Sequence, residues 1–217
     1  MDPKPESVPA SRPTSSGLPA SSTTPPPGPT PGLDASEELV AFPSDGLTLH
    51  GFLYRPRGDG PFPAVVFNHG SERQPGDKRG QAEFYVSHGF VLFVPHRRGQ
   101  GQPANVAEYI IAHAADHARA VAELASTQTD DVMSAVEYVR SLPYVDRTRV
   151  AVAGCSFGGI VSLFAAERGT GKPVRVHVFP ANGTTHEEGH GFCVGGEHPG
   201  WGDEVLEFLK TASQVAK

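Results

Sequence analysis

The sequence predicts an α/β fold in which helices cover both faces of a mostly parallel sheet. Residues 64–67 and 90–94 are continuous apolar runs, as expected of strands that are buried on both faces. Residues 150–153 form a third run of small and β-branched side chains, and an apolar helix is predicted after it, over 157–167. Because predicted helices alternate with these strands, the order favours βαβ units and a parallel sheet.

The first 33 of the 217 residues differ in composition from the rest of the chain. Residues 1–33 consist mainly of Pro, Ser, Thr, Ala and Gly and show no apolar periodicity. Such a segment cannot bury enough surface to offset its chain entropy. We therefore predict a disordered tail over 1–33 and one folded domain over 34–217, which is long enough to form a hydrophobic core.

The net charge of the chain limits the classes of molecule that it is expected to bind. The formal net charge is −6, which argues against nucleic acid or an anionic membrane, since either partner requires a clustered basic surface. The sequence has no apolar run of membrane-spanning length and no signal-peptide pattern, so we expect a cytoplasmic protein. No cofactor motif is found, because the glycine-rich basic loop 95–103 lacks the lysine and hydroxyl residue of a phosphate cradle. We expect that loop to lie on the surface, beside the active site that the motifs described below indicate.

The two cysteines, Cys155 and Cys193, are too few for a disulfide framework. Cys155 stands next to a predicted strand end, and we interpret it as a small buried side chain that fills space in the core.

The remaining elements follow from local patterns. Alternating residues on both sides of an Asp-Gly pair predict an antiparallel hairpin, and glycine ends a helix that precedes the second buried strand. A long helical region then has a break and a second half capped by Asp130 or Asp131. The predicted ranges are strands 39–42, 47–54 and 174–179, and helices 81–88, 105–142 with a break near 126–129, and 203–210.

The third strand ends in Gly154-Cys155-Ser156-Phe157-Gly158, which matches the pattern G-x-S-x-G. In a nucleophile elbow, serine occupies a strained turn between strand and helix, so its neighbours must be small. The Phe157 N–H would then lie at a helix N-terminus, where it can stabilise an oxyanion. The alternative is a glycine-rich turn in which Ser156 merely caps the helix. The strand and helix on either side favour the elbow.

A second oxyanion donor is predicted after the first buried strand. His69-Gly70 follows that strand, and in an elbow enzyme a backbone N–H at this strand end completes the oxyanion hole. Ser71 or Glu72 would supply that N–H.

Histidines occur in two places that invite a functional interpretation. His186-Glu187-Glu188-Gly189-His190 matches the zinc motif H-E-x-x-H, but zinc binding needs a helix, and the glycines in and around the motif argue against one. His190 instead stands after the last predicted strand, where a general base is expected. His113 and His117 are four residues apart, and we interpret them as solvent-facing rather than as metal ligands.

With these motifs in view, the chain from Glu37 onward resembles the α/β-hydrolase superfamily. More narrowly, it is similar to the dienelactone hydrolase family and to the related catalytic domains of prolyl-oligopeptidase-type enzymes. The resemblance implies Ser156 as nucleophile, His190 as general base, and the N–H groups of Phe157 and Ser71 as the oxyanion hole. It also implies an ester or lactone as the small-molecule substrate.

The chain departs from these relatives between the nucleophile and the base. Ser156 and His190 are only 34 positions apart (190 minus 156), whereas the relatives place two further strands and the catalytic acid there. We therefore expect a fold shortened by about two strands before the last one. The acid is not identified, and four carboxylates stay open: Glu187, Glu188, Glu197 and Asp203.

Three functions are compatible with these patterns. The first is a serine hydrolase that acts on carboxylic esters or lactones through an acyl-enzyme. The second is a non-catalytic remnant of the fold that has lost the triad acid. The third is a zinc hydrolase that uses His186 and His190 as ligands.

Overall fold

A computed structural model describes residues 35–102, 107–113, 115–169, 183–193 and 201–215. The chain divides into two units, 1–32 and 33–217, and all described residues belong to the second. The predicted tail 1–33 and the predicted strand 174–179 lie outside the described residues.

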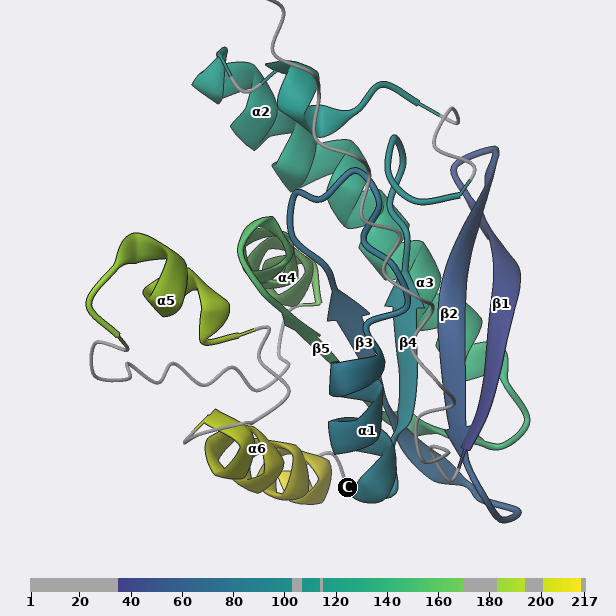
Figure 1. The fold of residues 1–217 in the computed structure, drawn as a ribbon. Coiled ribbons are helices and arrows are strands. Elements are labelled where there is room, and N and C mark those ends of the chain that lie inside the picture. Colours follow the sequence, from purple (N-terminus) through teal and green to yellow (C-terminus); the bar gives the residue numbers. More distant parts are fainter. Residues whose placement is uncertain (1–34, 103–106, 114, 170–182, 194–200, 216–217) are drawn as a thin grey trace, which may run out of the picture. The chain divides into compact units, whose positions relative to one another are not determined.

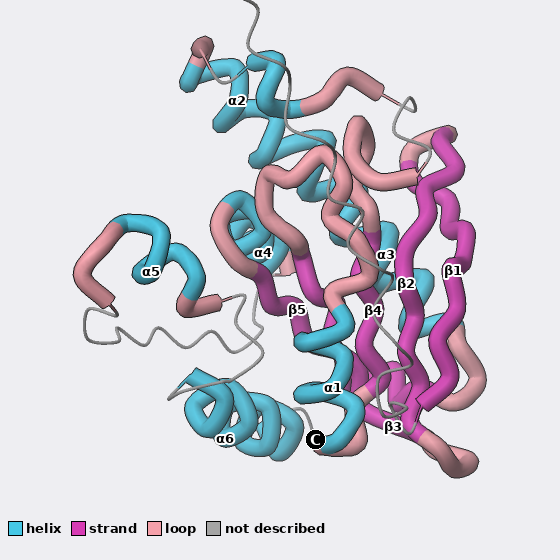
Figure 2. Tube along the Cα trace, viewed as in Figure 1, coloured by secondary structure: helices cyan, strands magenta, loops and turns pink. Residues whose placement is uncertain are grey.

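The described part of the chain contains a mixed sheet with strand order β1-β2-β4-β3-β5 (Figures 1 and 2). The three strands predicted as parallel do pair in parallel, β3 with β4 and β3 with β5, while β1 and β2 add an antiparallel hairpin at one side. The strands are β1 (Ala35–Ser44), β2 (Leu47–Pro56), β3 (Phe62–Asn68), β4 (Val91–Pro95) and β5 (Val145–Gly154). β5 forms one edge of this sheet.

The hairpin turn is shorter than predicted. Ser44 pairs with Leu47, so only Asp45 and Gly46 form the turn. Both have positive φ angles, 46° and 76°, as a two-residue type I′ turn requires. The Asp-Gly pair therefore sets the register of the two strands.

The helices agree with the predicted order but differ in detail. Their bounds are α1 (Arg79–Ser87), η1 (Ile110–His113), α2 (His117–Glu123), η2 (Leu124–Gln128), α3 (Thr129–Ser141), α4 (Phe157–Arg168), α5 (His186–Gly191) and α6 (Trp201–Val215). The predicted break near 126–129 is instead a π-helical turn, η2, which joins α2 to α3 without interruption. The capping role predicted for Asp130 or Asp131 is therefore wrong, since both lie inside a continuing helix. His113 and His117 belong to separate helical segments.

Alternate residues of the central strands pack on opposite faces of the sheet. On one face, Val65 and Leu92 join a core with α1 and α6. On the other face, Val66 and Phe93 pack with residues of α3. Figure 1 shows α1 and α3 on opposite sides of the strands. The prediction of helices on both faces is confirmed.

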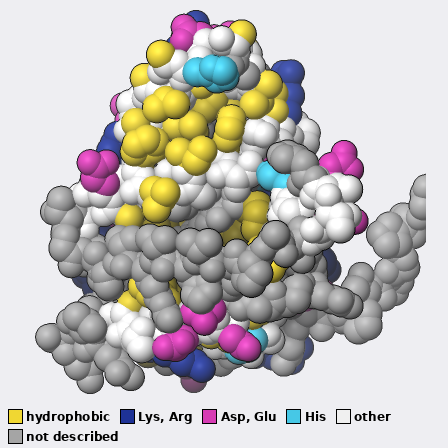
Figure 3. Space-filling view, turned by 90° about the vertical axis from the view of Figure 1, so that its left-hand side faces the viewer, with side chains coloured by type: hydrophobic (Ala, Val, Ile, Leu, Met, Phe, Trp, Pro, Cys, Tyr) yellow, Lys and Arg dark blue, Asp and Glu magenta, His cyan; other side chains and the backbone are white. Residues whose placement is uncertain are grey.

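α4 is only partly covered by the described residues. Val161 and Ala165 are buried against Val132 of α3, whereas Ile160 and Leu163 are 41% and 61% exposed. Figure 3 views the side on which α2 and α4 lie in Figure 1 and shows hydrophobic side chains gathered there. None of the helices in the described residues combines the length and the apolar character needed to cross a bilayer.

Candidate active site

Ser156 forms the turn between β5 and α4. Its backbone has φ 55° and ψ −127°, a region that non-glycine residues rarely adopt and that costs about 1–3 kcal/mol. The N–H groups of Gly159 and Ile160 donate to the Ser156 carbonyl at 2.9 and 3.2 Å, which holds the turn. The Ser156 side chain makes no capping hydrogen bond to α4 and is partly exposed. The interpretation of Ser156 as a capping serine is therefore wrong.

The glycines on either side of Ser156 are required by close backbone contacts. A Cβ on Gly154 would lie 2.3 Å from the carbonyl oxygen of Gly158, and one on Gly158 would lie 1.9 Å from the carbonyl oxygen of Asn68. Both distances are far below the van der Waals contact distance of carbon and oxygen. The two oxygens belong to the backbone, so a side-chain rotation could not relieve either clash. The pattern G-x-S-x-G thus follows from how the turn packs against the end of β3.

The loop after β3 lies beside Ser156. A Cβ on Gly70 would be 3.3 Å from the Ser156 Cβ, so the backbone at Gly70 borders the serine. Ser71 comes next, and its carbonyl accepts a hydrogen bond from the Tyr109 hydroxyl. Phe157 begins α4, and N–H groups in the first turn of a helix have no intrahelical acceptor. Gly70, the residue before Ser71, thus borders Ser156, and Phe157 follows Ser156 directly.

The prediction that loop 95–103 lies on the surface is wrong at Arg97. Its side chain is 1% exposed. Nη2 donates to the carbonyl oxygens of His69 and Gly70 at 2.8 and 2.9 Å, and Nε donates to the Gln128 amide oxygen at 3.0 Å. One guanidinium therefore links the loop after β3 to the π-helical turn.

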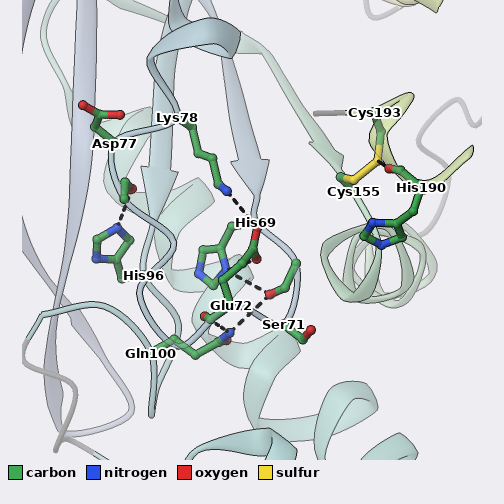
Figure 4. Close-up of polar contacts among 12 residues, drawn as sticks. His69, Ser71, Glu72, Asp77, Lys78, His96, Gln100, Cys155, His190 and Cys193 are labelled. Atoms are coloured by element: carbon green, nitrogen blue, oxygen red, sulfur yellow. Dashed lines mark hydrogen bonds and ion pairs between the residues drawn. A yellow bond between two sulfur atoms is a disulfide. The ribbon is translucent and has the colours of Figure 1, made fainter. Parts of the chain in front are cut away.

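Gln100 also holds this loop (Figure 4). Its Nε2 donates to the carbonyl oxygens of Gly70 and Glu72 at 3.2 and 2.8 Å. The Glu72 carboxylate in turn accepts from Lys78 Nζ at 2.8 Å. Burial raises the pKa of Glu72, but the hydrogen bond and charge of Lys78 outweigh it, so the pKa is lowered. The backbone carbonyls of the four consecutive residues 69–72 thus all accept hydrogen bonds from side chains of Arg97, Gln100 or Tyr109.

The buried groups around Arg97 have shifted pKa values. Burial lowers the pKa of Arg97 to about 10, with partial compensation from Asp131 and Glu72, so the guanidinium stays charged at neutral pH. Burial, followed by the charge of Arg97, lowers the pKa of His69 well below its usual value. Burial also lowers the pKa of His96. Both histidines are therefore neutral.

Asp131 anchors the neighbouring Arg98. The carboxylate is fully buried and accepts from the Arg98 backbone N–H and from Nη2, both at 2.8 Å, and from the Ser44 hydroxyl at 2.6 Å. The sequence patterns placed Arg97 and Arg98 only in a glycine-rich basic loop and did not predict either role. The available signal was their position directly after a buried strand, at the carboxyl end of the parallel sheet, where polar side chains converge.

His190 lies on α5, so the prediction that the glycines of this segment prevent a helix is wrong. The helix starts with a capping box, in which the Glu188 N–H donates to Thr185 Oγ1 while the Glu188 carboxylate accepts from the Thr185 N–H. These contacts compensate for the two glycines of the segment. The His190 side chain is exposed.

The four acid candidates lie in different places. Glu188 also accepts from the Thr184 N–H at 2.6 Å, and these backbone hydrogen bonds lower its pKa. Glu187 is exposed on α5, and Asp203 is exposed in the first turn of α6. Glu197 lies outside the described residues.

Cys155 and Cys193 form a disulfide, with a Cα–Cα distance of 5.7 Å. Cys155 is buried as predicted, but it is also disulfide-bonded, which the interpretation as a space-filling side chain did not include. The pairing was not visible in the sequence, since the two cysteines are 38 positions apart and only the folded chain brings Cys193 to the elbow. Among the side chains that the structure describes, which do not include that of His186, no group of three or more could hold a metal ion.

The part of the chain that contains this site is similar to known proteins. Residues 40–176 match the acetyl xylan esterase family. A peptidase of Bacillus subtilis (strain 168), YtmA, is 26% identical over 140 residues, which are 64% of this chain and 48% of the relative. The quorum-quenching protein AidA of Acinetobacter baumannii (strain MDR-ZJ06) is 29% identical over 128 residues, 55% of this chain and 36% of the relative.

Among solved structures, esterase Est22 is 23% identical, with a TM-score of 0.49 over 62% of this chain and 39% of that one. The chain spans about half or less of the length of these curated relatives. The predicted superfamily is confirmed, because the matched region covers β2 to α4 and with them Ser156 and the loop after β3. The chain belongs to the acetyl xylan esterase family of the α/β-hydrolase superfamily.

Proposed function

We propose that this protein is a serine hydrolase that cleaves carboxylic esters or lactones through an acyl-enzyme on Ser156. The observation that carries the proposal is the Ser156 backbone, held at φ 55° between β5 and α4 with a side chain that does not cap the helix. A strained backbone at a strand-to-helix turn directs the hydroxyl away from the helix and toward a substrate.

In the proposed reaction, Ser156 Oγ attacks the carbonyl carbon while His190 takes its proton. The N–H groups of Phe157 and Ser71 stabilise the oxyanion of the tetrahedral intermediate. His190 then protonates the leaving alcohol, and water, activated by the same imidazole, releases the acid. The fixed loop 69–72 supports this proposal, because an oxyanion hole is effective only when its donors are held in place before the reaction.

The family supports acetyl esters as the first substrates to test. The matched family is described as acetyl xylan esterase, and Est22 is an esterase. YtmA is described as a peptidase, so a peptide substrate is the natural comparison. We expect turnover of p-nitrophenyl acetate, in which a small acyl group places little demand on the site.

The test is labelling with a fluorophosphonate probe together with turnover of p-nitrophenyl acetate. We expect an adduct on Ser156, and a loss of kcat of at least about 10³-fold in Ser156→Ala. Ser141→Ala, which removes a hydroxyl from the exposed end of α3, serves as the matched control and should keep full activity. Folded wild type that gives neither adduct nor turnover would exclude the proposal.

That negative result would favour a non-catalytic protein that keeps the hydrolase fold. One observation favours this second candidate: the Glu188 carboxylate, one of the acid candidates, is occupied by the N–H groups of Thr184 and Thr185. Circular dichroism and a cooperative thermal transition would establish that the inactive protein is folded.

A further inference from the structure

We propose that the Cys155–Cys193 disulfide is a positioning device for catalysis, which tethers the general base His190 to the nucleophile Ser156. This inference rests on the proposed function and adds a redox dependence to it. Cys155 directly precedes Ser156, and Cys193 follows His190 by three residues. The bond therefore connects the two catalytic candidates through very short lengths of chain. Figure 4 shows His190 beside the two bonded cysteines.

The Cys155 end of the bond is rigid. Its N–H donates to the Asn68 carbonyl at 3.2 Å, and its carbonyl accepts from the Gly158 N–H at 2.9 Å. The side chain is 3% exposed and belongs to the core that contains residues of α1 and α6. A sulfur held in this way transmits the fixed geometry of the elbow to whatever is bonded to it.

The Cys193 end lies against the backbone of the catalytic candidate. Cys193 Sγ is 3.6 Å from the His190 carbonyl oxygen. Phe192 and Cys193 pack on the same core as Cys155, and the Phe192 N–H donates to the Gly189 carbonyl at 3.3 Å, which extends the last turn of α5. The position of His190 thus follows the position of the disulfide.

α5 is a short helix with an exposed surface. The helix has six residues, two of them glycine, and its described side chains from Glu187 to His190 are exposed. Helices of this length are not stable in water without tertiary contacts. The capping box joins Thr185 to Glu188 within the same segment, so it shapes the helix without attaching it to the elbow. The disulfide provides a covalent attachment.

The test compares oxidised protein with protein treated with dithiothreitol, at a temperature where both are folded by circular dichroism. Reduction transfers two electrons and two protons from the dithiol to the disulfide, which gives two protein thiols and the cyclic disulfide of the reagent. Thiol titration should find no free thiol in the oxidised protein and two after reduction. We expect kcat/KM for p-nitrophenyl acetate to fall at least tenfold on reduction, and Cys193→Ala to show the same loss without reductant.

A second arm separates positioning from general stabilisation. In His190→Ala the base is gone, so reduction should not lower the residual activity further, whereas a structural role would lower both activities by the same factor. Active oxidised wild type whose rate survives reduction, or two free thiols in the folded untreated protein, would overturn the inference alone. Inactive oxidised wild type without a fluorophosphonate adduct would overturn the proposed function and the inference with it.

Discussion

Arg97 donates a hydrogen bond to the carbonyl oxygen of His69 at 2.8 Å, deep beneath the loop that borders Ser156. The same Nη2 reaches the Gly70 carbonyl at 2.9 Å. A charged donor that satisfies two consecutive buried carbonyls fixes the peptide planes of the loop, and these planes set the direction of the next N–H, that of Ser71. The side chain of Arg97 thereby connects the core of the protein to the proposed oxyanion hole.

Replacing Arg97 should therefore affect both stability and catalysis. Arg97→Met removes the charged donor that the His69 and Gly70 carbonyls share, although Gln100 Nε2 still donates to the Gly70 carbonyl. The substitution should lower the free energy of unfolding by about 3 kcal/mol or more, measured by urea denaturation. Under conditions where the variant is folded, kcat for p-nitrophenyl acetate should fall while KM changes little. Arg119→Met, which alters a side chain 59% exposed, is the control and should change neither. Equal kcat values for wild type and Arg97→Met would disprove the link to the oxyanion hole.

The glycines around Ser156 allow a matched comparison. Gly158→Ala places a Cβ 1.9 Å from a backbone oxygen, whereas Gly159→Ala meets its nearest atom at 3.6 Å, an ordinary contact. We expect Gly158→Ala to lower the melting temperature strongly and to abolish fluorophosphonate labelling. Gly159→Ala lies inside α4 and should be neutral or stabilising, by up to about 1 kcal/mol, because alanine favours helix. Similar melting temperatures for the two variants would show that the turn is looser than the structure indicates.

Asp130 and Asp131 are adjacent on α3 but differ in burial. Asp131 is fully buried with Arg98 and Ser44, whereas Asp130 pairs with Arg168 at the surface. Asp131→Asn should lower the free energy of unfolding by about 3 kcal/mol or more, since it removes the buried charged partner of Arg98, whose ion pair with the exposed Asp45 is longer, at 3.8 Å. Asp130→Asn should cost less than about 1 kcal/mol. Chemical denaturation of both variants checks this difference, and a reversed order would contradict the assignment of the buried pair.

The buried histidines predict a pH dependence of stability. Burial lowers the pKa of both His69 and His96 in the folded state, while in the unfolded chain a histidine titrates near about 6.5. Below that pH the unfolded state binds more protons than the folded state. The free energy of unfolding should therefore be at its full value above about pH 7. As the pH falls below about 6.5 it should decrease, by up to about 1.4 kcal/mol per pH unit for each histidine.

The measurement is a series of urea denaturation curves between pH 5 and pH 8. His69→Gln should make the pH dependence shallower, because one of the two proton-linked groups is removed. His117→Gln, at the exposed start of α2, is the control and should keep the wild-type slope. A His69→Gln slope equal to that of wild type would refute the assignment.

Local sequence patterns determined much of the fold and the position of the nucleophile. Apolar runs predicted β3 and β4, the Asp-Gly pair predicted the hairpin, and G-x-S-x-G predicted the turn at Ser156. These features depend on neighbouring residues, since backbone conformation and side-chain period are set within a few positions. The helix α5 is also encoded locally, by the capping box of Thr185 and Glu188, which the prediction from the glycine content did not include.

The tertiary structure alone decided which distant groups meet at this turn. A sequence cannot show that Arg97 is buried, because basic residues in glycine-rich loops usually lie on the protein surface. The burial of Arg97 depends on backbone carbonyls that lie 27 and 28 residues away in the sequence. Nor can a sequence show that Cys155 meets Cys193, 38 residues later. Such contacts depend on how the helices and strands pack around the sheet. The burial of a single charged side chain or cysteine leaves no local pattern in the sequence.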